Sequence, residues 1–354
     1  MKVLTVIGAR PQFIKAAAVS RVLRRENTEI LLHTGQHYDY QMSEVFFREL
    51  EIPQPDYNLE VGSAGHSAQT GEMLIRMEPI FEKERPDYVL VYGDTNSTLA
   101  GALAASKLSI PVAHVEAGLR SFNRAMPEEI NRVVTDHVSQ FLFCPSQLAV
   151  DNLRLEGITS GVHLVGDVMY DAVLRHTEAA EKKSNILRSL NLTRGKYLLA
   201  TLHRQGNVEN PKHLLNFLEA LSLTKEVVVF PAHPRTLKAI KSAGISLGGN
   251  IMLIEPVGYL DMLWLEKNAR MILTDSGGMQ KEAYWAGVPC VTLREETEWV
   301  ETVQSGWNVI AGMDQARIMA AVKGFPPPSS HPSLFGAGDA SLKIVRHLMN
   351  EKRK

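Results

Sequence analysis

The sequence has little that would tie it to a membrane, to nucleic acid or to an oxidising compartment. Its two cysteines, Cys144 and Cys290, each lie in an apolar run, as core cysteines of a reducing compartment do. A formal net charge of −1 gives no overall attraction to polyanions. No apolar run reaches the ~20 residues that cross a bilayer. Because the chain opens on a strand pattern, no secretory leader is expected. We predict a cytoplasmic protein without a nucleic-acid or membrane partner.

What the sequence does contain is an alternation of strand and helix patterns, which predicts parallel sheets flanked by helices. A chain of 354 residues that is 45% hydrophobic can bury two cores. A charged stretch with few strand signals, about 171–192, predicts the crossover between them. We expect two doubly wound, Rossmann-like α/β domains with a cleft between them. They comprise residues 1–170 and 171–335, and a last helix within 336–354 returns to the first domain.

Three acidic residues of the first domain stand at or just beyond the ends of apolar segments. Asp94 and Glu116 each end such a segment, and Glu128 follows a short loop later. In an open parallel sheet the ligand lies at the carboxyl ends of the strands. Acids in that place transfer protons, bind a metal or hold sugar hydroxyls. With two cysteines and no strong metal spacing, proton transfer is the favoured interpretation.

The second domain contains a strand end, two glycines and a helix start in succession, Thr274-Asp275-Ser276-Gly277-Gly278-Met279-Gln280-Lys281-Glu282. Exposed N–H groups and the positive end of the helix dipole suit a phosphate there. Glu282, further along the helix, is placed to accept the hydroxyls of a ribose. The alternative is an ordinary Asp or Ser cap with a glycine turn. Glu282 at this offset and a further candidate phosphate loop favour binding.

That further loop directly follows the first strand and contains Arg10 and Lys15. It lacks the later glycines of a dinucleotide fingerprint and it is not a Walker loop, so neither a nicotinamide nor an ATP site is supported. Both cations lie where they would face the cleft and meet a diphosphate. Surface cations at a helix start are the alternative.

Two histidines end strands at the same predicted edge of the second sheet. His203 and His233 each follow an apolar strand, so binding or proton roles are plausible for both. His33 and His37 have a spacing found in metal sites, but the Thr34-Gly35 pair between them is typical of a loop. We therefore predict no metal and no cofactor.

Taken in order, these segments resemble the non-hydrolysing UDP-N-acetylglucosamine 2-epimerases. The resemblance covers nearly the whole chain. The matching segments are Gly8-Ala9-Arg10-Pro11 with Lys15, Gly35-Gln36-His37, Gly93-Asp94-Thr95-Asn96-Ser97, His114-Val115-Glu116-Ala117-Gly118-Leu119-Arg120, Pro127-Glu128-Glu129-Ile130-Asn131-Arg132, His203-Arg204, His233-Pro234 and Asp275-Ser276-Gly277-Gly278 with Glu282. The resemblance implies an isomerase with the two-domain fold of GT-B glycosyltransferases, cytoplasmic and homodimeric, that needs no nicotinamide or metal.

The resemblance also implies a reaction and roles for these residues. C2 of a UDP-2-acetamido sugar is inverted by elimination and re-addition of UDP through a bound 2-acetamidoglucal. Asp94, Glu116 and Glu128 match the family's catalytic acids, with no assignment of each to a face of C2. His203 joins the catalytic set because, with Arg10 and the start of the Ser276-Gly277-Gly278 helix, it can stabilise the departing diphosphate. The implied substrate-binding residues are Arg10, Lys15, His233, Ser276, Gly277, Gly278, Glu282 and Arg294.

Some positions depart from the family's common pattern. Gly206 stands where relatives commonly have Glu, and Met262 where many have Phe. The segments 121–126 and 293–299 resemble a branch that acts on UDP-2,3-diacetamido-2,3-dideoxy-glucuronic acid in lipopolysaccharide and O-antigen assembly. Its C6 carboxylate would need another cation, for which Arg124 and Arg294 are candidates. We slightly favour this substrate over UDP-N-acetylglucosamine.

Other classes of function stay open at this point. A GT-B glycosyltransferase would share the fold and the nucleotide site, but it needs an acceptor and has less use for acids near C2. A hydrolysing 2-epimerase would release the free sugar and UDP. A nucleotide-sugar sensor without activity would be expected to lack one of the acids, and all are present.

Overall fold

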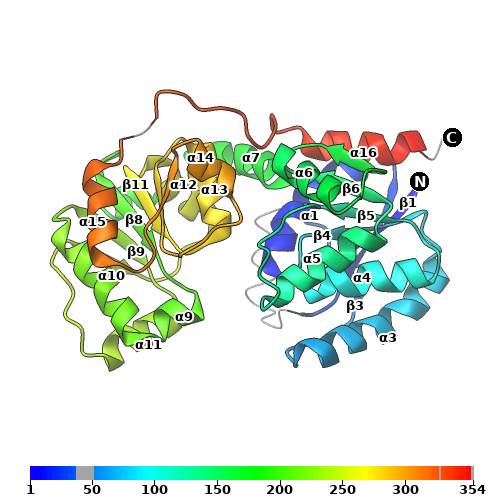
Figure 1. Cartoon of the computed structure of the whole chain (residues 1–354), viewed down its shortest axis with the longest axis horizontal. Helices are drawn as coiled ribbons and strands as arrows, with labels where there is room; N and C mark the ends of the chain where they lie inside the picture. Colours follow the sequence, from blue (N-terminus) through cyan, green and yellow to red (C-terminus); the bar gives the residue numbers. More distant parts are fainter. Residues whose placement is uncertain (37–51, 327, 352–354) are drawn as a thin grey trace. The chain divides into compact units, whose positions relative to one another are not determined.

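A computed structural model describes residues 1–36, 52–326 and 328–351, apart from the side chains of Arg10 and Gln205. The chain divides into two compact units. Unit 1 comprises Met1–Ala172 together with Ser333–Lys354, and unit 2 comprises Val173–Pro332. Figure 1 shows that each unit consists of a sheet flanked by helices. His37 lies outside the described residues, so its part in a metal site is not addressed.

Unit 1 contains a fully parallel sheet in the order β3-β2-β1-β4-β5-β6-β7. Its strands are β1 Lys2–Ile7, β2 Thr28–His33, β3 Tyr57–Asn58, β4 Tyr88–Tyr92, β5 Val112–Val115, β6 Phe141–Cys144 and β7 Val162–Leu164. The helices are α1 Arg10–Leu23, α3 His66–Glu84, α4 Asn96–Lys107, α5 Pro127–Val138, α6 Gln147–Leu155 and α16 Ala340–Glu351, while α7 Val168–Lys183 contains the boundary with unit 2.

Small residues let α4 pack closely against the central strands. A Cβ added at Gly101 would lie 3.1 Å from Val91 and 3.2 Å from Val6, both of which are buried. On its other side α4 packs against α3, whose Met77 and Phe81 are fully buried. We did not predict α3 from the sequence, and it continues through Pro79.

The C-terminal helix is anchored in unit 1 by an acid that is distant in the sequence. Asp171 accepts hydrogen bonds from the backbone N–H groups of Ala340 (3.2 Å) and Ser341 (2.7 Å). These groups belong to the first turn of α16, where helix N–H groups lack partners of their own. The helix also packs against α1.

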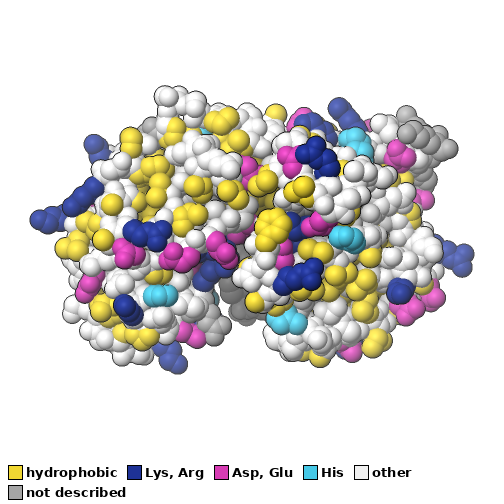
Figure 2. Space-filling model, in the orientation of Figure 1, with side chains coloured by type: hydrophobic (Ala, Val, Ile, Leu, Met, Phe, Trp, Pro, Cys, Tyr) yellow, Lys and Arg dark blue, Asp and Glu magenta, His cyan; other side chains and the backbone are white. Residues whose placement is uncertain are grey.

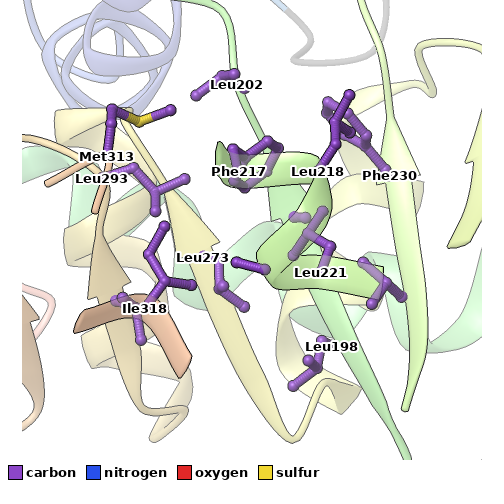
Figure 3. Close-up of a cluster of buried hydrophobic side chains, with 14 of the residues drawn as sticks. Leu198, Leu202, Phe217, Leu218, Leu221, Phe230, Leu273, Leu293, Met313 and Ile318 are labelled. Atoms are coloured by element: carbon purple, nitrogen blue, oxygen red, sulfur yellow. The ribbon is translucent and has the colours of Figure 1, made fainter. Parts of the chain in front are cut away.

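Unit 2 contains a second parallel sheet in the order β10-β9-β8-β11-β12-β13. Its strands are β8 Tyr197–Thr201, β9 Val227–Pro231, β10 Ile251–Ile254, β11 Met271–Thr274, β12 Cys290–Thr292 and β13 Asn308–Ile310. Its helices are α8 Ile186–Ser189, α9 Gln205–Val208, α10 Pro211–Leu223, α11 Pro234–Ser242, α12 Tyr259–Asn268, α13 Gly277–Ala286, α14 Val300–Gln304 and α15 Gln315–Gly324. Figure 3 shows part of one core cluster, in which Phe217 and Leu221 of α10 meet Leu198 and Leu273 of the sheet.

Each sheet reverses its strand order once, and ligands of doubly wound folds bind at the carboxyl ends of the strands beside that reversal. In unit 1 the reversal lies between β1 and β4, and in unit 2 it lies between β8 and β11. The loops after these strands contain the Gly8-Ala9 and Gly93-Asp94 pairs in unit 1, and the His203-Arg204 and Asp275-Ser276 pairs in unit 2. The topology therefore points to the segments that the sequence analysis selected.

The surface has no single sign of charge on the face drawn in Figure 2, where basic and acidic side chains are interspersed. None of the helices formed by the described residues has the length and apolar character that crossing a bilayer requires.

Candidate active site

A buried glutamine joins the two loops at the reversal of the unit 1 sheet. The side-chain carbonyl of Gln12 accepts hydrogen bonds from the backbone N–H groups of Gly8 (2.8 Å) and Ala9 (3.0 Å). Its amide donates to the carbonyl of Tyr92 (2.9 Å) and to the hydroxyl of Thr98 (3.0 Å). The start of α1 is thereby fixed to the end of β4. We did not select Gln12 from the sequence, because a glutamine in the first turn of a helix has no distinctive pattern.

A buried ion pair lies at the same edge of the sheet. Lys15 of α1 pairs with Glu116, and their side chains are 10% and 9% exposed. Glu116 follows β5 with a φ of 71°, in the left-handed region, which costs about 1–3 kcal/mol for a residue with a side chain. Gly93 also has a positive φ, and a Cβ there would lie 3.2 Å from Lys15 Nζ and 3.6 Å from Glu116 Oε2. The positive φ and the close approach of Lys15 both favour glycine at this position.

Asp94 is held by the helix that contains the third acid. Arg132 of α5 forms an ion pair with the Asp94 carboxylate and reaches Glu129 at 3.2 Å. Asn131 donates to the Asp94 carbonyl at 2.9 Å. The first turn of α5 contains Glu128, which is exposed. Asp94, Glu116 and the start of α5 thus lie at one edge of the sheet, and Arg132 is a further site residue that we did not select from the sequence.

In unit 2, Asp275 gathers the groups at the reversal of the sheet. Its fully buried carboxylate accepts hydrogen bonds from the backbone N–H groups of His203 (3.2 Å) and Arg204 (2.9 Å) and from the Asn207 amide (3.1 Å). His203 Nδ1 lies 3.0 Å from Asp275 Oδ1, while about half of the imidazole is exposed. Burial by itself raises the pKa of Asp275, but the hydrogen bond and charge of His203, with the Arg204 N–H and Asn207, lower it overall. Asp275 thus holds His203 in place, while the imidazole ring of His203 stays open to solvent.

The start of α13 has the form that the sequence predicts. Ser276 is its N-cap, and its hydroxyl accepts from the Met279 N–H at 3.4 Å. A Cβ on Gly277 would lie 2.4 Å from a carboxylate oxygen of Glu298, so a larger residue there would displace the Glu298 side chain. Gly278 is open, with only the Ser276 hydroxyl near its Cβ position, at 3.8 Å. The helix start can therefore receive an anion over Gly278.

Arg294 follows β12 and is largely buried. Its guanidinium donates to the Glu298 carboxylate at 2.9 Å, and the two side chains are 8% and 18% exposed. The positive charge of Arg294 is therefore matched within unit 2.

Glu282 lies on the buried side of α13, 9% exposed, near another acid. Burial, followed by the charge of Glu282, raises the pKa of Glu266 on α12 well above its ordinary value. A carboxylate at the position of Glu282 has the acceptor oxygens that the hydroxyl groups of a ribose require.

The remaining candidates lie at the same edges of the sheets. His233 follows β9, next to β8; it is exposed and caps α11 by accepting from the Arg235 N–H at 3.2 Å. Arg10 is the first residue of α1. Gly206 is in α9, with open space around its Cβ position.

The Asp275 carboxylate generates a prediction about stability. Because folding lowers the pKa of Asp275, the ionised carboxylate stabilises the folded protein at pH values above its unfolded pKa of about 3.9. This stabilisation is lost as the pH falls through the lower pKa of the folded protein. We expect Asp275→Asn to lower the free energy of unfolding by about 1.5–3 kcal/mol at neutral pH. The difference in the free energy of unfolding between Asp275→Asn and the unmodified protein should narrow below about pH 4. Denaturant unfolding followed across this pH range measures it, and a gap that is constant with pH would contradict it.

Sequence comparisons identify the family over most of the chain. The profile of the UDP-N-acetylglucosamine 2-epimerase family matches residues 21–349. A Methanococcus maripaludis protein named as a homolog of UDP-N-acetylglucosamine 2-epimerase is 55% identical, covering 99% of this chain and 100% of the relative. A UDP-2,3-diacetamido-2,3-dideoxy-D-glucuronate 2-epimerase of Pseudomonas aeruginosa is 48% identical, covering 98% of this chain and 99% of the relative.

Solved structures are similar over the same length. The UDP-N-acetylglucosamine 2-epimerase of Methanocaldococcus jannaschii, in complex with UDP-N-acetylglucosamine and UDP, superposes with a TM-score of 0.90 at 45% identity, covering 99% of this chain and 100% of that one. The Neisseria meningitidis enzyme bound to UDP-N-acetylglucosamine also gives a TM-score of 0.90, at 33% identity and with the same coverage. The GT-B-like α/β fold is confirmed. The chain therefore belongs to the UDP-N-acetylglucosamine 2-epimerase family and is a non-hydrolysing UDP-sugar 2-epimerase, an isomerase.

Proposed function

We propose that unit 1 transfers the C2 proton of a UDP-2-acetamido sugar and that unit 2 holds the UDP that leaves and returns. The observation that supports this most is the placing of Asp94 and Glu116 at the ends of neighbouring strands, each beside a cation. Lys15 pairs with Glu116 and Arg132 pairs with Asp94, while Glu128 is in contact with solvent.

The chemistry has two steps that mirror each other. One acid–base group removes the proton from C2, the C1–O bond breaks, and UDP departs with the bonding electrons to leave a 2-acetamidoglucal. A second group then donates a proton to C2 from the opposite face, and the β-phosphate oxygen of UDP re-forms the bond to C1. Inversion needs acid–base groups on both faces, which is why one carboxylate would not suffice.

Departure of UDP places negative charge on its diphosphate, and unit 2 offers positive potential at the reversal of its sheet. The start of α13 at Ser276 and Gly278 presents N–H groups and the positive end of the helix dipole. His203, held by Asp275, adds a donor that can face the phosphate. Glu282 receives the ribose hydroxyls in this proposal, while Lys15 of unit 1 is paired with Glu116.

For the sugar we propose UDP-2,3-diacetamido-2,3-dideoxy-glucuronic acid, and UDP-N-acetylglucosamine is the alternative. The Pseudomonas aeruginosa relative named for the first substrate supports this choice. Between the two cations considered for the C6 carboxylate, the contacts favour Arg124 over Arg294, since Arg294 already pairs with Glu298. Arg124 is exposed, four residues before Glu128.

The loop that contains Arg124 is held in a defined conformation. The Glu129 carboxylate accepts hydrogen bonds from the N–H and hydroxyl of Ser121 and from the N–H of Phe122, each at 2.9 Å. Glu129 also contacts Arg132, which pairs with Asp94. This chain of contacts links the loop to a proposed catalytic acid.

Incubation with each UDP-sugar in deuterium oxide tests the reaction. We expect deuterium at C2 with the UDP-sugar retained, because the proton removed is replaced from solvent before UDP re-adds. Accumulating free sugar would indicate a hydrolysing enzyme, and absence of exchange with both sugars would contradict the proposal. A higher kcat/KM for UDP-N-acetylglucosamine than for the diacetamido uronate would reject only the choice of sugar.

Removing Arg124 should separate the two sugars. We expect Arg124→Ala to raise the KM for the diacetamido uronate by about 10- to 100-fold, the effect of losing a charge-assisted hydrogen bond. Turnover of UDP-N-acetylglucosamine should be unaffected, since that sugar has no C6 carboxylate. Arg154→Ala, at an exposed position on α6, is the matched control and should change neither value. Equal losses on both sugars would contradict this role for Arg124.

A further inference from the structure

One fully buried histidine of unit 1 makes contacts that have no role in the reaction proposed above. His114, in the middle of β5, is 0% exposed. Its Nδ1 lies 2.7 Å from Asp136 Oδ1, and its Nε2 lies 2.7 Å from the carbonyl oxygen of Gly93. A carboxylate and a carbonyl only accept hydrogen bonds, so the ring donates from both nitrogens.

The charges around this ring are matched by the side chains that face it. Asp136 also accepts hydrogen bonds from Arg120 (2.7 Å) and from the Gly118 N–H (3.1 Å). Arg120 in turn makes two hydrogen bonds to Glu156, each of 2.7 Å. Burial by itself raises the pKa of Asp136, but the hydrogen bond and charge of His114, with Arg120, lower it overall. Asp136 is thus shared between the His114 ring and Arg120, and Arg120 also binds Glu156.

Gly93 is held by β5 through both its N–H and its carbonyl. Its N–H donates to the Val115 carbonyl at 2.9 Å, and its carbonyl accepts from His114. Gly93 directly precedes Asp94 and packs beside the Lys15–Glu116 pair. Fixing Gly93 to β5 therefore restrains the position of Asp94 relative to Glu116, in addition to the contacts of Asp94 with Arg132 and Asn131.

We propose that His114 and Asp136 are positioning residues that set the separation of Asp94 and Glu116, acting through the Gly93 carbonyl. The proposal rests on the proposed function in that it takes these two acids as the proton-transfer groups. His114 itself touches neither sugar nor UDP. Its loss should slow proton transfer while nucleotide binding, which unit 2 provides, stays intact.

Two substitutions at His114 test the proposal with the UDP-sugar that the unmodified protein exchanges. We expect His114→Leu, which leaves the Gly93 carbonyl without its donor, to lower kcat for C2 exchange by about 100-fold, as small misplacements of catalytic groups do. KM and the affinity for UDP should stay at their original values. His114→Gln places an amide N–H near the Nε2 position and should recover part of kcat.

Val112→Ala on the same strand is the control, because it removes buried volume from β5 without touching Gly93. It should lower stability and leave kcat unchanged. The proposal would be overturned if kcat in His114→Leu were unaltered, or if KM rose while kcat stayed the same. An equal loss of kcat in Val112→Ala would also overturn it.

Nitrogen NMR of the unmodified protein with labelled histidine gives a readout independent of activity. We expect a hydrogen-bonded N–H at Nε2 of the His114 ring, assigned by its through-space contacts to neighbouring residues of β5. Its absence would overturn the proposal even if neither variant folds. If no UDP-sugar is exchanged at all, the proposed function fails, whereas the ring signals still report on the contacts of His114.

Discussion

A carboxylate that folding withdraws from water must be given a cation or donors, and this requirement shapes the strand ends of both units. Glu116 has Lys15, and Asp275 has His203 with two backbone N–H groups, while Asp94, which is only partly buried, pairs with Arg132. Leaving a buried charge without its partner costs about 3–5 kcal/mol. That exceeds the ~1–3 kcal/mol of a left-handed backbone, which is why Glu116 can keep its unfavourable φ in order to face Lys15.

The same pairing makes these positions suitable for chemistry. Carboxylates that are oriented before the substrate arrives need no rearrangement to accept a proton, and orientation accounts for much of the rate acceleration by enzymes. Two parallel sheets deliver the groups, since each brings the ends of its strands to a single edge. Unit 1 contributes acids with their cations. Unit 2 contributes a helix start and an exposed imidazole, which suit a departing diphosphate.

Much of this could be predicted from the sequence because it is local. Apolar runs that end in Asp94 and Glu116 identify strand ends, and the Ser276-Gly277-Gly278 segment identifies a helix start. The resemblance in ordered motifs identified the reaction and the fold. The parallel α/β architecture followed from the alternation of strands and helices.

The partners of those residues could not be predicted, because they are distant in the sequence and have no motif of their own. Lys15 and Glu116 are 101 positions apart, and Arg132 and Asp94 are 38 apart. Gln12 is a glutamine in a first turn, and only the structure shows that it reaches Tyr92 and Thr98. The helix α3 escaped prediction because its Pro79 argues against a helix interior.

The central claim is that acids of unit 1 start a reaction in which UDP leaves and returns. A UDP-sugar with a heavy oxygen isotope between C1 and the β-phosphorus tests it most directly. While UDP is free of C1, its β-phosphate can rotate, so the label should spread to the non-bridging oxygens as C2 exchanges with solvent. In Asp94→Asn both processes should slow together. Exchange at C2 with the label still between C1 and phosphorus would contradict the account.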